Sequence, residues 1–372
     1  MKEKNMQIPP NTPIHTEPPL LLTVKGSHLQ MGQQIGEGAS QQVKHSIENA
    51  RIMLDSAYQK LRLTWDRARI QASKYMPFAQ ERYPQYVEEL RGIAQGANVS
   101  FEDLAIVNAM EAVTTDAVHL DRCTSLAVNG DRTANGHVFA AHNEDWNPAD
   151  EPDVYLVHAT PDKEPPFLSM NYGGLLSNIG LNAYGIAQMC DSVYPSDSRI
   201  GVPRLFVSRA VLAASTPGEA ITHMLSPRRA AGYNHVLVHE SGELYNVEVS
   251  ARRFAIRYGE DGYVAHTNNY LNANMQDIEK DPEDLVNSRV RYFRALRQVK
   301  RTPLHTLETL QAILKDHVNY PDSICNHSIK ENSPLEDGKT INALIFDLTS
   351  RELHFAWGNP CANPFHTFRL SD

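Results

Sequence analysis

The sequence predicts a mixed fold, α+β or α/β, in which β-sheets are covered by helices. Between residues 20 and 115, apolar side chains recur mostly at helical spacing. After residue 123 the chain is dominated by short apolar runs typical of strands, and pairs of helical segments interrupt those runs. Alternation of this kind is typical of sheets packed against helices. With 372 residues and 41% hydrophobic content, the chain is long enough to bury a large core.

The region before residue 115 is expected to be mostly helical. A short strand is expected at 20–24, and the next residues should turn into a helix that continues, with a break, toward residue 70. Apolar residues three and four apart predict another helix at 85–95. Ser100, followed by acidic residues two and three positions later, is typical of a helix N-cap and predicts a helix through Met110.

The region after residue 123 is expected to alternate strands with helices. Strands are expected at 138–142, 154–158, 167–171, 186–190, 235–239, 244–249, 343–347 and 353–357. Helices are expected at 203–214, 217–225, 288–299 and 306–315. The second of these helices begins with Thr216, Pro217 and Glu219, which form a capping box with proline in the first turn.

Composition excludes several classes of function. A net charge of −9 argues against nucleic-acid or anionic-membrane partners. No run approaches 18 apolar residues, so no membrane span is expected. Residues 1–19 lack the apolar core of a signal peptide and are predicted to be a disordered lead-in. The four cysteines form no C-x-x-C pair, so we expect no metal and no cofactor, in a reduced, cytoplasmic setting.

Cys123 is the candidate nucleophile. It precedes two β-type runs, the second of which ends in His142-Asn143-Glu144-Asp145-Trp146. If the chain is cut just before Cys123, one residue carries both a thiol and a free α-amine with a pKa of about 7.7–8.0. That amine can act as the base for the thiol in acyl transfer. A cysteine without such an environment is usually a small buried apolar side chain, so the residues alone leave both roles open.

The order of several segments carries a resemblance to a known family. The segment Cys123-Thr124-Ser125, a following Asn-Gly turn and the His142–Trp146 segment are similar to the β-chain start of the acyl-coenzyme A:6-aminopenicillanic acid acyltransferase family of self-processing N-terminal-nucleophile (Ntn) hydrolases. Later segments agree in order, at 180–187, 234–238 with 245–248, and 266–270, so the likeness covers roughly residues 20–360. The resemblance implies an α+β fold, the four-layer αββα sandwich of Ntn hydrolases.

The same resemblance implies three catalytic residues. Cys123 would be the nucleophile, and the carboxylate of Asp145 would orient the Cys123 amine. Asn268 would donate a hydrogen bond to the oxyanion. The residues alone do not decide the roles of Asp145 and Asn268. Asp145 lies two positions before Asn147 and can be a turn or capping residue, and Asn268 can be a turn residue.

Four residues are expected to line the substrate cleft. Glu144 and Trp146 belong to the same segment as Asp145, and Glu144 stands where the penicillin enzyme has an aromatic residue. Asn182 and Tyr184 lie in a glycine-rich hairpin that resembles a cleft-lining element, although ordinary turn residues fit that hairpin equally well. Asn326 stands where the family often has arginine, which weakens the expectation of a carboxylate-bearing substrate.

We therefore expect a precursor that cuts its own Arg122–Cys123 bond. The products, an α-chain of residues 1–122 and a β-chain of residues 123–372, would remain together as a heterodimer in one globular domain. Cys123 would then attack a small-molecule amide or an acyl-CoA thioester, and the acyl group would pass to water or to an amine. Two alternatives stay open. One is a cysteine amidohydrolase that pairs Cys123 with a histidine and is not cut, and the other is a non-catalytic relative that binds a small amide.

Overall fold

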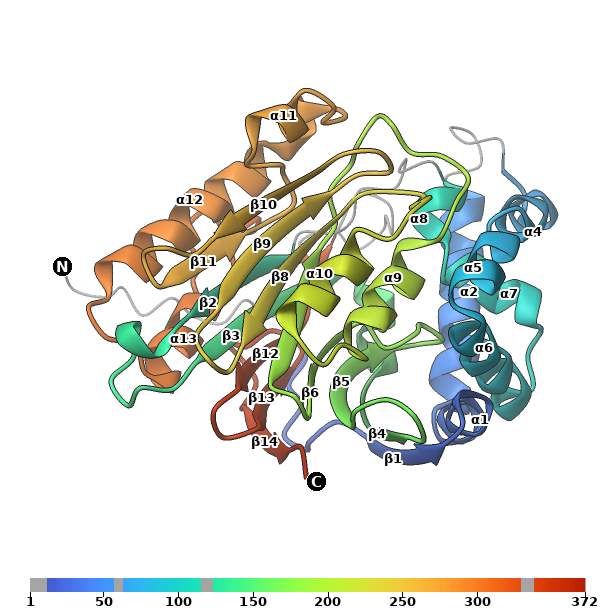
Figure 1. The fold of residues 1–372 in the computed structure, drawn as a ribbon, viewed down its shortest axis with the longest axis horizontal. Helices are drawn as coiled ribbons and strands as arrows, with labels where there is room; N and C mark the ends of the chain where they lie inside the picture. The colour runs from blue at the N-terminus through green and yellow to red at the C-terminus, as the bar shows by residue number, and fades with distance from the viewer. Residues whose placement is uncertain (1–11, 57–62, 115–122, 329–337, 372) are drawn as a thin grey trace.

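Two central sheets organise the computed structural model, which describes residues 12–56, 63–114, 123–328 and 338–371 (Figure 1). Within these residues, one sheet has the strand order β1-β4-β5-β6-β7-β8-β9-β10 and the other has the order β11-β2-β3-β12-β13-β14. The strands of the first sheet are β1 (Leu21–Gly26), β4 (Val154–Pro161), β5 (Phe167–Tyr172), β6 (Ile179–Asn182), β7 (Ile186–Asp191), β8 (Tyr233–His239), β9 (Leu244–Val249) and β10 (Phe254–Tyr258). Those of the second are β2 (Thr124–Val128), β3 (Phe139–Trp146), β11 (Tyr263–His266), β12 (Lys339–Asp347), β13 (Glu352–Trp357) and β14 (His366–Arg369).

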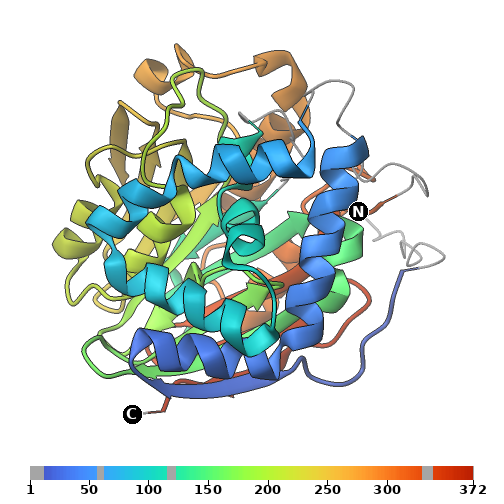
Figure 2. The same ribbon diagram turned by 90° about the vertical axis from the view of Figure 1, so that its right-hand side faces the viewer.

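Helices cover the outer faces of both sheets. Those before residue 115 gather on one side of the molecule (Figure 2): α1 (His28–Gly38), α2 (Ser40–Ser56), α4 (Trp65–Ser73), α5 (Met76–Arg82), α6 (Pro84–Ala97), α7 (Phe101–Val107) and α8 (Met110–Val113). The later ones are α9 (Arg204–Val211), α10 (Pro217–Met224), α11 (Ala273–Gln276), α12 (Val286–Arg301) and α13 (Leu307–Leu314). In the described ranges, none of the helices has the length and apolar content needed to cross a membrane.

Alternating side chains along the strands establish four layers. Ala127 of β2 packs in the core between the sheets, whereas Leu126 and Val128 pack against α12 and α13. On the first sheet, Leu156 of β4 belongs to the inter-sheet core, and its neighbour Tyr155 packs in the cluster that includes α1, α6 and α9. The arrangement is an αββα sandwich, which confirms the fold that the family resemblance implied.

Helices α1 and α6 cross in close backbone contact. Each carries two glycines four residues apart at the crossing, Gly32 and Gly36 in α1 and Gly92 and Gly96 in α6. A Cβ added at Gly32 would lie 2.0 Å from the backbone oxygen of Glu89, and one added at Gly92 would lie 2.2 Å from a backbone oxygen of α1. Because real Cβ atoms do not approach backbone oxygens so closely, these positions require glycine.

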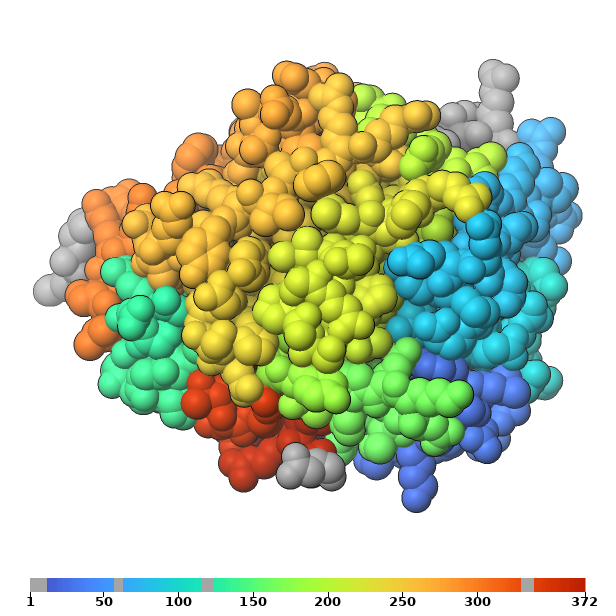
Figure 3. All heavy atoms as spheres, in the orientation of Figure 1, coloured from blue at the N-terminus to red at the C-terminus, as the bar shows by residue number. Residues whose placement is uncertain are grey.

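Strand β1 joins the helical N-terminal region to the sheets. It pairs in parallel with β4, in a register that places Leu21 opposite Leu156. A buried ion pair adds a second connection, since the guanidinium of Arg209 in α9 donates two hydrogen bonds of 3.0 Å to Glu89 in α6. The surface view shows the resulting contact between the N-terminal helices and the rest of the molecule (Figure 3).

The described part of the lead-in also touches the folded body. His15 stacks on Trp357 with ring centroids 4.0 Å apart, and its Nε2 lies 2.7 Å from the carboxylate of Glu151. Residues 12–19, which composition marks as disordered, thus include a side chain with specific partners. Residues 1–11 of the predicted lead-in lie outside the described residues.

The structure differs from the sequence predictions in several elements, and helices α5 and α11, for example, fall in no predicted range. The helix expected to run from Ser100 through Met110 ends at Val107, because the buried amide of Asn108 bonds to the carbonyl oxygens of Leu104 and Gly174 and the chain turns there. Three strands were not predicted, namely β10, β11 and β14. All three lie at an edge of a sheet. An edge strand needs only one partner and keeps polar residues, so its sequence pattern is weak.

Candidate active site

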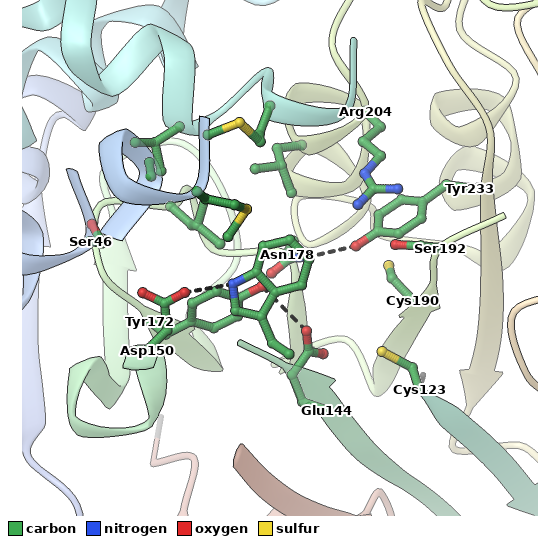
Figure 4. Close-up of a pocket in the computed structure, with 17 residues that line it drawn as sticks. Ser46, Cys123, Glu144, Asp150, Tyr172, Asn178, Cys190, Ser192, Arg204 and Tyr233 are labelled. Atoms are coloured by element: carbon green, nitrogen blue, oxygen red, sulfur yellow. Dashed lines mark hydrogen bonds between the residues drawn. The ribbon is translucent and has the colours of Figure 1, made fainter. Parts of the chain in front are cut away.

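Cys123 lies in the wall of a cavity that is lined by residues before and after it in the sequence (Figure 4). Residues that precede Cys123 supply a mostly apolar wall: Ser46, Ala50, Met53, Val107 and Met110. Residues that follow it supply a more polar wall, which includes Glu144, Trp146, Asp150, Tyr172, Asn178, Ser192, Arg204 and Tyr233. The cavity can therefore receive a molecule with an apolar part and a polar or charged part.

The thiol of Cys123 is buried at the start of strand β2. Its exposed fraction is 2%, and Sγ lies 3.9 Å from the backbone oxygen of Asp145. Strands β2 and β3 are antiparallel, and Thr124 pairs with Asn143. Cys123 precedes Thr124 and Glu144 follows Asn143, so these two residues lie side by side. Arg122, the other residue of the predicted cleavage site, lies outside the described residues.

Asp145 is fully buried next to the nucleophile strand. Its Oδ1 accepts a hydrogen bond of 2.6 Å from the hydroxyl of Thr340, which is its register partner on β12. The Thr340 hydroxyl in turn accepts a hydrogen bond of 2.9 Å from the backbone N–H of Asn326. The carboxylate thus has a fixed orientation that is set by the neighbouring strand.

Asn268 follows strand β11 and is also buried. Its side-chain Nδ2 donates to the backbone oxygen of Ser192 at 3.1 Å, and Ser192 lines the cavity. Its Oδ1 accepts a hydrogen bond of 2.9 Å from Arg291. An amide nitrogen has two hydrogens, so Nδ2 retains a second hydrogen that it can donate.

Arg291 of α12 connects these residues, and the sequence analysis did not find it. Its guanidinium, which is buried, donates to the backbone oxygen of Cys123 at 2.5 Å, to the hydroxyl of Thr124 at 3.1 Å and to Asn268. The segment 286–301 contains several basic residues, and only their position on the helix distinguishes them. Arg291 shares the buried face with Ser288, Ala295 and Val299, and a charge on an apolar face was the available signal.

The four expected cleft residues fall into two groups. Glu144 and Trp146 line the cavity with Cys123, as expected. Asn182 and Tyr184 are not among the described residues that line it. Asn182 is buried in the turn between β6 and β7, where its amide donates to two backbone oxygens after α9 and accepts from the backbone N–H of Tyr184, while the Tyr184 side chain is 52% exposed. Asn182 therefore stabilises the hairpin between β6 and β7, and Tyr184 lies on the surface of that hairpin.

A buried hydrogen-bonded chain leads from the cavity into the space between the sheets. Nε2 of His142 lies 2.9 Å from the carboxylate of Glu144, and Nδ1 lies 2.9 Å from the hydroxyl of Ser125. That hydroxyl donates to Asp191 at 2.8 Å, so it must accept from Nδ1–H of His142. The other ring nitrogen then faces Glu144, and a proton must lie between them, either on His142 as a second proton or on Glu144.

The chain continues to a buried imidazole between two carboxylates. His266 contacts Asp191 at 3.2 Å and Glu248 at 3.1 Å. Burial alone lowers the pKa of His266, but the two carboxylates outweigh burial and raise the pKa to about 9. Burial conversely raises the pKa of Asp191, and hydrogen bonding with His266 outweighs it, so the pKa of Asp191 is lowered. The two buried carboxylates thus favour the protonated form of His266.

Asp150 adds a second titratable group to the cavity wall. Burial raises the pKa of its carboxyl to about 6, against the opposing effect of hydrogen bonds from Asn49 and Trp146, each 2.7 Å long. The guanidinium of Arg204 lies 4.3 Å from the centre of the Tyr233 ring in the same wall. The polar wall therefore offers groups of both signs.

A metal ion fits poorly among the residues around Cys123. The donor atoms of Cys123, His142 and Glu144 all lie within 4.8 Å of one another. Both ring nitrogens of His142 already have partners, however, in Ser125 and Glu144. A ligating imidazole needs a nitrogen lone pair that points at the metal.

Comparisons with known proteins agree with these observations. The sequence profile of the family described as acyl-coenzyme A:6-aminopenicillanic acid acyl-transferase matches residues 132–362. The 40 kDa form of the acyl-coenzyme A:6-aminopenicillanic-acid-acyltransferase of Emericella nidulans is 24% identical over 355 residues, which cover 95% of this chain and 96% of that protein. The beta-alanyl-dopamine/carcinine hydrolase of Drosophila melanogaster is 23% identical over 384 residues, which cover 94% and 95%.

Among solved structures, a variant of the conjugated bile acid hydrolase from Clostridium perfringens aligns with 67% of this chain and 97% of that chain. The sequence identity is 12% and the TM-score is 0.47. The fold assignment rests on the two sheets and their helical layers rather than on this alignment.

Proposed function

Because the chain belongs to the acyl-coenzyme A:6-aminopenicillanic acid acyl-transferase family, we propose that it is a self-processing amide hydrolase or acyltransferase with Cys123 as its nucleophile. The observation that carries the proposal is the position of Cys123. Its thiol lies in a cavity wall at the start of a central strand, 3.9 Å from the backbone oxygen of Asp145, and Arg291 links the backbone oxygen of Cys123 to the side chain of Asn268.

The first reaction is the cut that frees the Cys123 amine. Sγ of Cys123 attacks the carbonyl carbon of Arg122, the C–N bond between the two residues breaks, and the nitrogen takes up a proton. The resulting thioester is hydrolysed by water, which leaves a carboxylate on Arg122 and a free thiol on Cys123. An α-chain of residues 1–122 and a β-chain of residues 123–372 result.

The mature enzyme uses the same thiol on its substrate. The free amine of Cys123 takes the thiol proton as Sγ attacks the amide or thioester carbonyl. The carboxylate of Asp145, oriented by Thr340, holds the amine in position. The second hydrogen of Asn268 Nδ2 donates to the oxyanion, an interaction worth roughly 3–4 kcal/mol in the transition state. The leaving group, an amine from an amide or a thiolate from a thioester, takes the proton, and the acyl group then passes from Cys123 to water or to another amine.

The cavity supports a small amide that is apolar at one end and charged at the other. Met53, Val107 and Met110 suit an apolar group, while Glu144 suits a positively charged amino group beside the reacting carbonyl. The relatives named above act, by their names, on 6-aminopenicillanic acid with acyl-coenzyme A, and on beta-alanyl-dopamine and carcinine. We propose a substrate of this size class, with acyl-CoA as the acyl donor if the acceptor is an amine.

Intact-mass measurement of the purified protein under denaturing conditions tests the proposal. We expect two chains, of which the larger begins at Cys123, together with turnover of small amides. Cys123→Ala should remain a single chain and should be inactive. A wild-type preparation that is neither cut nor able to hydrolyse or transfer any amide would overturn the proposal.

A second candidate function has one observation in its favour, the nearness of His142 to the thiol. In that mechanism His142 activates Cys123 directly and the chain is never cut. A full-length wild-type protein whose amide hydrolysis is lost in both Cys123→Ala and His142→Gln would establish it. The third alternative, a non-catalytic binding protein, predicts that the thiol reacts with no electrophilic amide probe.

A further inference from the structure

Four potential metal ligands meet at a site formed by two loop segments. His317, Cys325 and His327 lie between α13 and β12, and Cys361 lies between β13 and β14. Their donor atoms all lie within 4.8 Å of one another. Nε2 of His327 is 3.0 Å from Nε2 of His317 and 3.5 Å from the sulfur atoms of both Cys325 and Cys361.

Hydrogen bonding alone does not account for this arrangement. A ring nitrogen carries either one hydrogen or one lone pair, so Nε2 of His327 can serve only one of its three neighbours. Cys325 and His327 are almost fully buried, so water has little access to these two groups, whereas His317 and Cys361 are half-buried. Donor atoms that approach one another in this way without a shared hydrogen are typical of ligands around a common cation.

The spacing of the donor atoms agrees with one geometry. Zinc binds thiolate sulfur at about 2.3 Å and imidazole nitrogen at about 2.0–2.1 Å in a tetrahedron, which places N and S ligands about 3.5–3.6 Å apart and two N ligands about 3.3 Å apart. The observed separations are 3.5 Å for both N–S pairs and 3.0 Å for the N–N pair. We propose that His317, Cys325, His327 and Cys361 bind one structural Zn²⁺ ion.

The surroundings support a closed, structural site rather than a catalytic one. Four protein ligands complete a tetrahedron and leave no position for water or substrate. The side-chain amide of Asn359 lies 3.5 Å from the Cys325 sulfur and donates to the backbone oxygen of Asn326 at 2.7 Å. An N–H beside a ligating sulfur is a common second-layer contact, because it stabilises the thiolate charge.

The proposed ion would brace the loop that supports Asp145. Asn326, next to the ligand Cys325, donates to Thr340, and Thr340 donates to Asp145. The side chain of Asn143 on β3 also donates to the backbone oxygens of Leu314, at the end of α13, and of Ile324, next to Cys325. Because Cys361 comes from a different connection, the ion would cross-link two segments that the sheet itself does not join.

Sequence spacing could not indicate this site. We expected no metal because no two cysteines are separated by two residues. The four ligands have spacings of eight, two and 34 positions along the chain. They converge only because β12 and β13 are paired and bring the residues after β13 next to those before β12.

Elemental analysis of the full-length protein, purified without chelator or affinity metal, tests the proposal. We expect about one zinc per chain. Cys361→Ser and His317→Gln should each lower the zinc content at least about tenfold, because three ligands hold zinc far more weakly than four. Cys190→Ser is the matched control: Cys190 is buried and outside the cluster, so its replacement should leave the zinc content unchanged. The readout is independent of activity and of self-cleavage.

Cobalt substitution, chelation and intact-mass measurement test the proposed zinc site further. Co²⁺ in the wild-type site should give the visible bands of tetrahedral S₂N₂ ligation, and Cys361→Ser should lose them. If the single variants fail to fold, chelation of the wild-type protein provides the test, and a lowered melting temperature that added Zn²⁺ restores is the expected result. Wild-type protein without metal after expression with added zinc would overturn the proposal, as would an intact mass that shows a Cys325–Cys361 disulfide.

Discussion

At the scale of single residues, the partners of Asn268 decide what its amide can do. Arginine only donates hydrogen bonds, so the atom of Asn268 that faces Arg291 must be the oxygen. The nitrogen then faces the backbone oxygen of Ser192, a residue that lines the cavity. The same guanidinium holds the backbone of Cys123. Arg291 is therefore a positioning residue that sets the distance between the nucleophile and the proposed oxyanion donor.

Asn268→Ala should lower kcat by roughly 100- to 1,000-fold while KM changes little, because the amide meets its partner fully only in the tetrahedral state. Steady-state kinetics on already processed protein measure this effect. Asn274→Ala is the control, since Asn274 is exposed and the hydrogen bonds recorded for it use its backbone. A near-normal kcat in the Asn268 variant would mean that the residue only shapes a turn.

The pKa of His266 makes stability depend on pH in a defined direction. The native pKa is about 9, above the value of about 6.5 in an unfolded chain, so the protonated imidazole stabilises the fold fully below about pH 6.5. This contribution is lost as pH rises through 9. Between those values the free energy of unfolding should fall more steeply in the wild type than in His266→Gln, as chemical denaturation at several pH values can measure.

A second histidine serves as a reference for that measurement. Burial lowers the pKa of His28, but contacts with Glu164 and Glu89 outweigh burial and raise the pKa to about 9. His28→Gln should therefore remove a separate part of the same pH dependence and leave the part due to His266. Equal slopes in the wild type and in His266→Gln would show that His266 is neutral in the folded protein.

Sequence patterns predicted some of the residues around Cys123 and did not predict others. Cys123, Glu144 and Trp146 were expected together because they lie within one short stretch of chain, and the cavity does bring them together. Arg291 in α12 contacts Cys123, and Asp191 in β7 contacts Ser125, in each case from a distant segment of the chain. Contacts over more than 60 positions leave no periodic signal in a sequence, so only the folded structure reveals them.

At the scale of elements, local signals predicted helices and inner strands well. The capping residues Ser100 and Thr216 stand at the starts of α7 and α10, where their hydroxyls accept hydrogen bonds from backbone N–H groups. Inner strands such as β12, which is buried along its whole length and contains the apolar run 343–346, were expected, whereas the edge strands β10, β11 and β14 were missed. The glycines at the crossing of α1 and α6 carry a further constraint that local signals do not reveal.

Gly92→Ala should destabilise the protein by about 3 kcal/mol, because the new methyl group would overlap a backbone oxygen of α1 and force the helices apart. Urea denaturation of the inactive Cys123→Ala precursor measures the effect without interference from chain cleavage. Gly218→Ala is the matched control. Gly218 also lies in a helix, and a Cβ there would have no neighbour within 4 Å, so the change should be neutral or slightly stabilising. Similar stability of the two variants would mean that α1 and α6 separate at little cost.

At the scale of the whole molecule, the residues before Cys123 are part of the same body as those after it. They supply β1 to the first sheet, a helical layer over that sheet, and the apolar wall of the cavity. The sequence predicted the character of the two regions but not this degree of integration, because the parallel pairing of β1 with β4 joins residues more than 130 positions apart.

The processed protein should therefore behave as one particle. Size-exclusion chromatography in native buffer should give a single peak that contains both chains, while a denaturing gel of the same peak should show them apart. The buried Arg209–Glu89 pair and the β1–β4 pairing would both have to break before the chains could separate. Release of the smaller chain in native buffer would contradict this account.

The position of strand β1 affects how the protein folds and how it is inactivated by unfolding. Before the cut, its pairing with β4 forms within one molecule, so folding of the precursor is first-order. If the proposed cut occurs, a denatured sample must afterwards bring two separate polypeptides together to rebuild the same sheet edge, and renaturation becomes second-order in protein concentration. The working lifetime of the mature protein would then depend on how slowly it first unfolds rather than on its equilibrium stability.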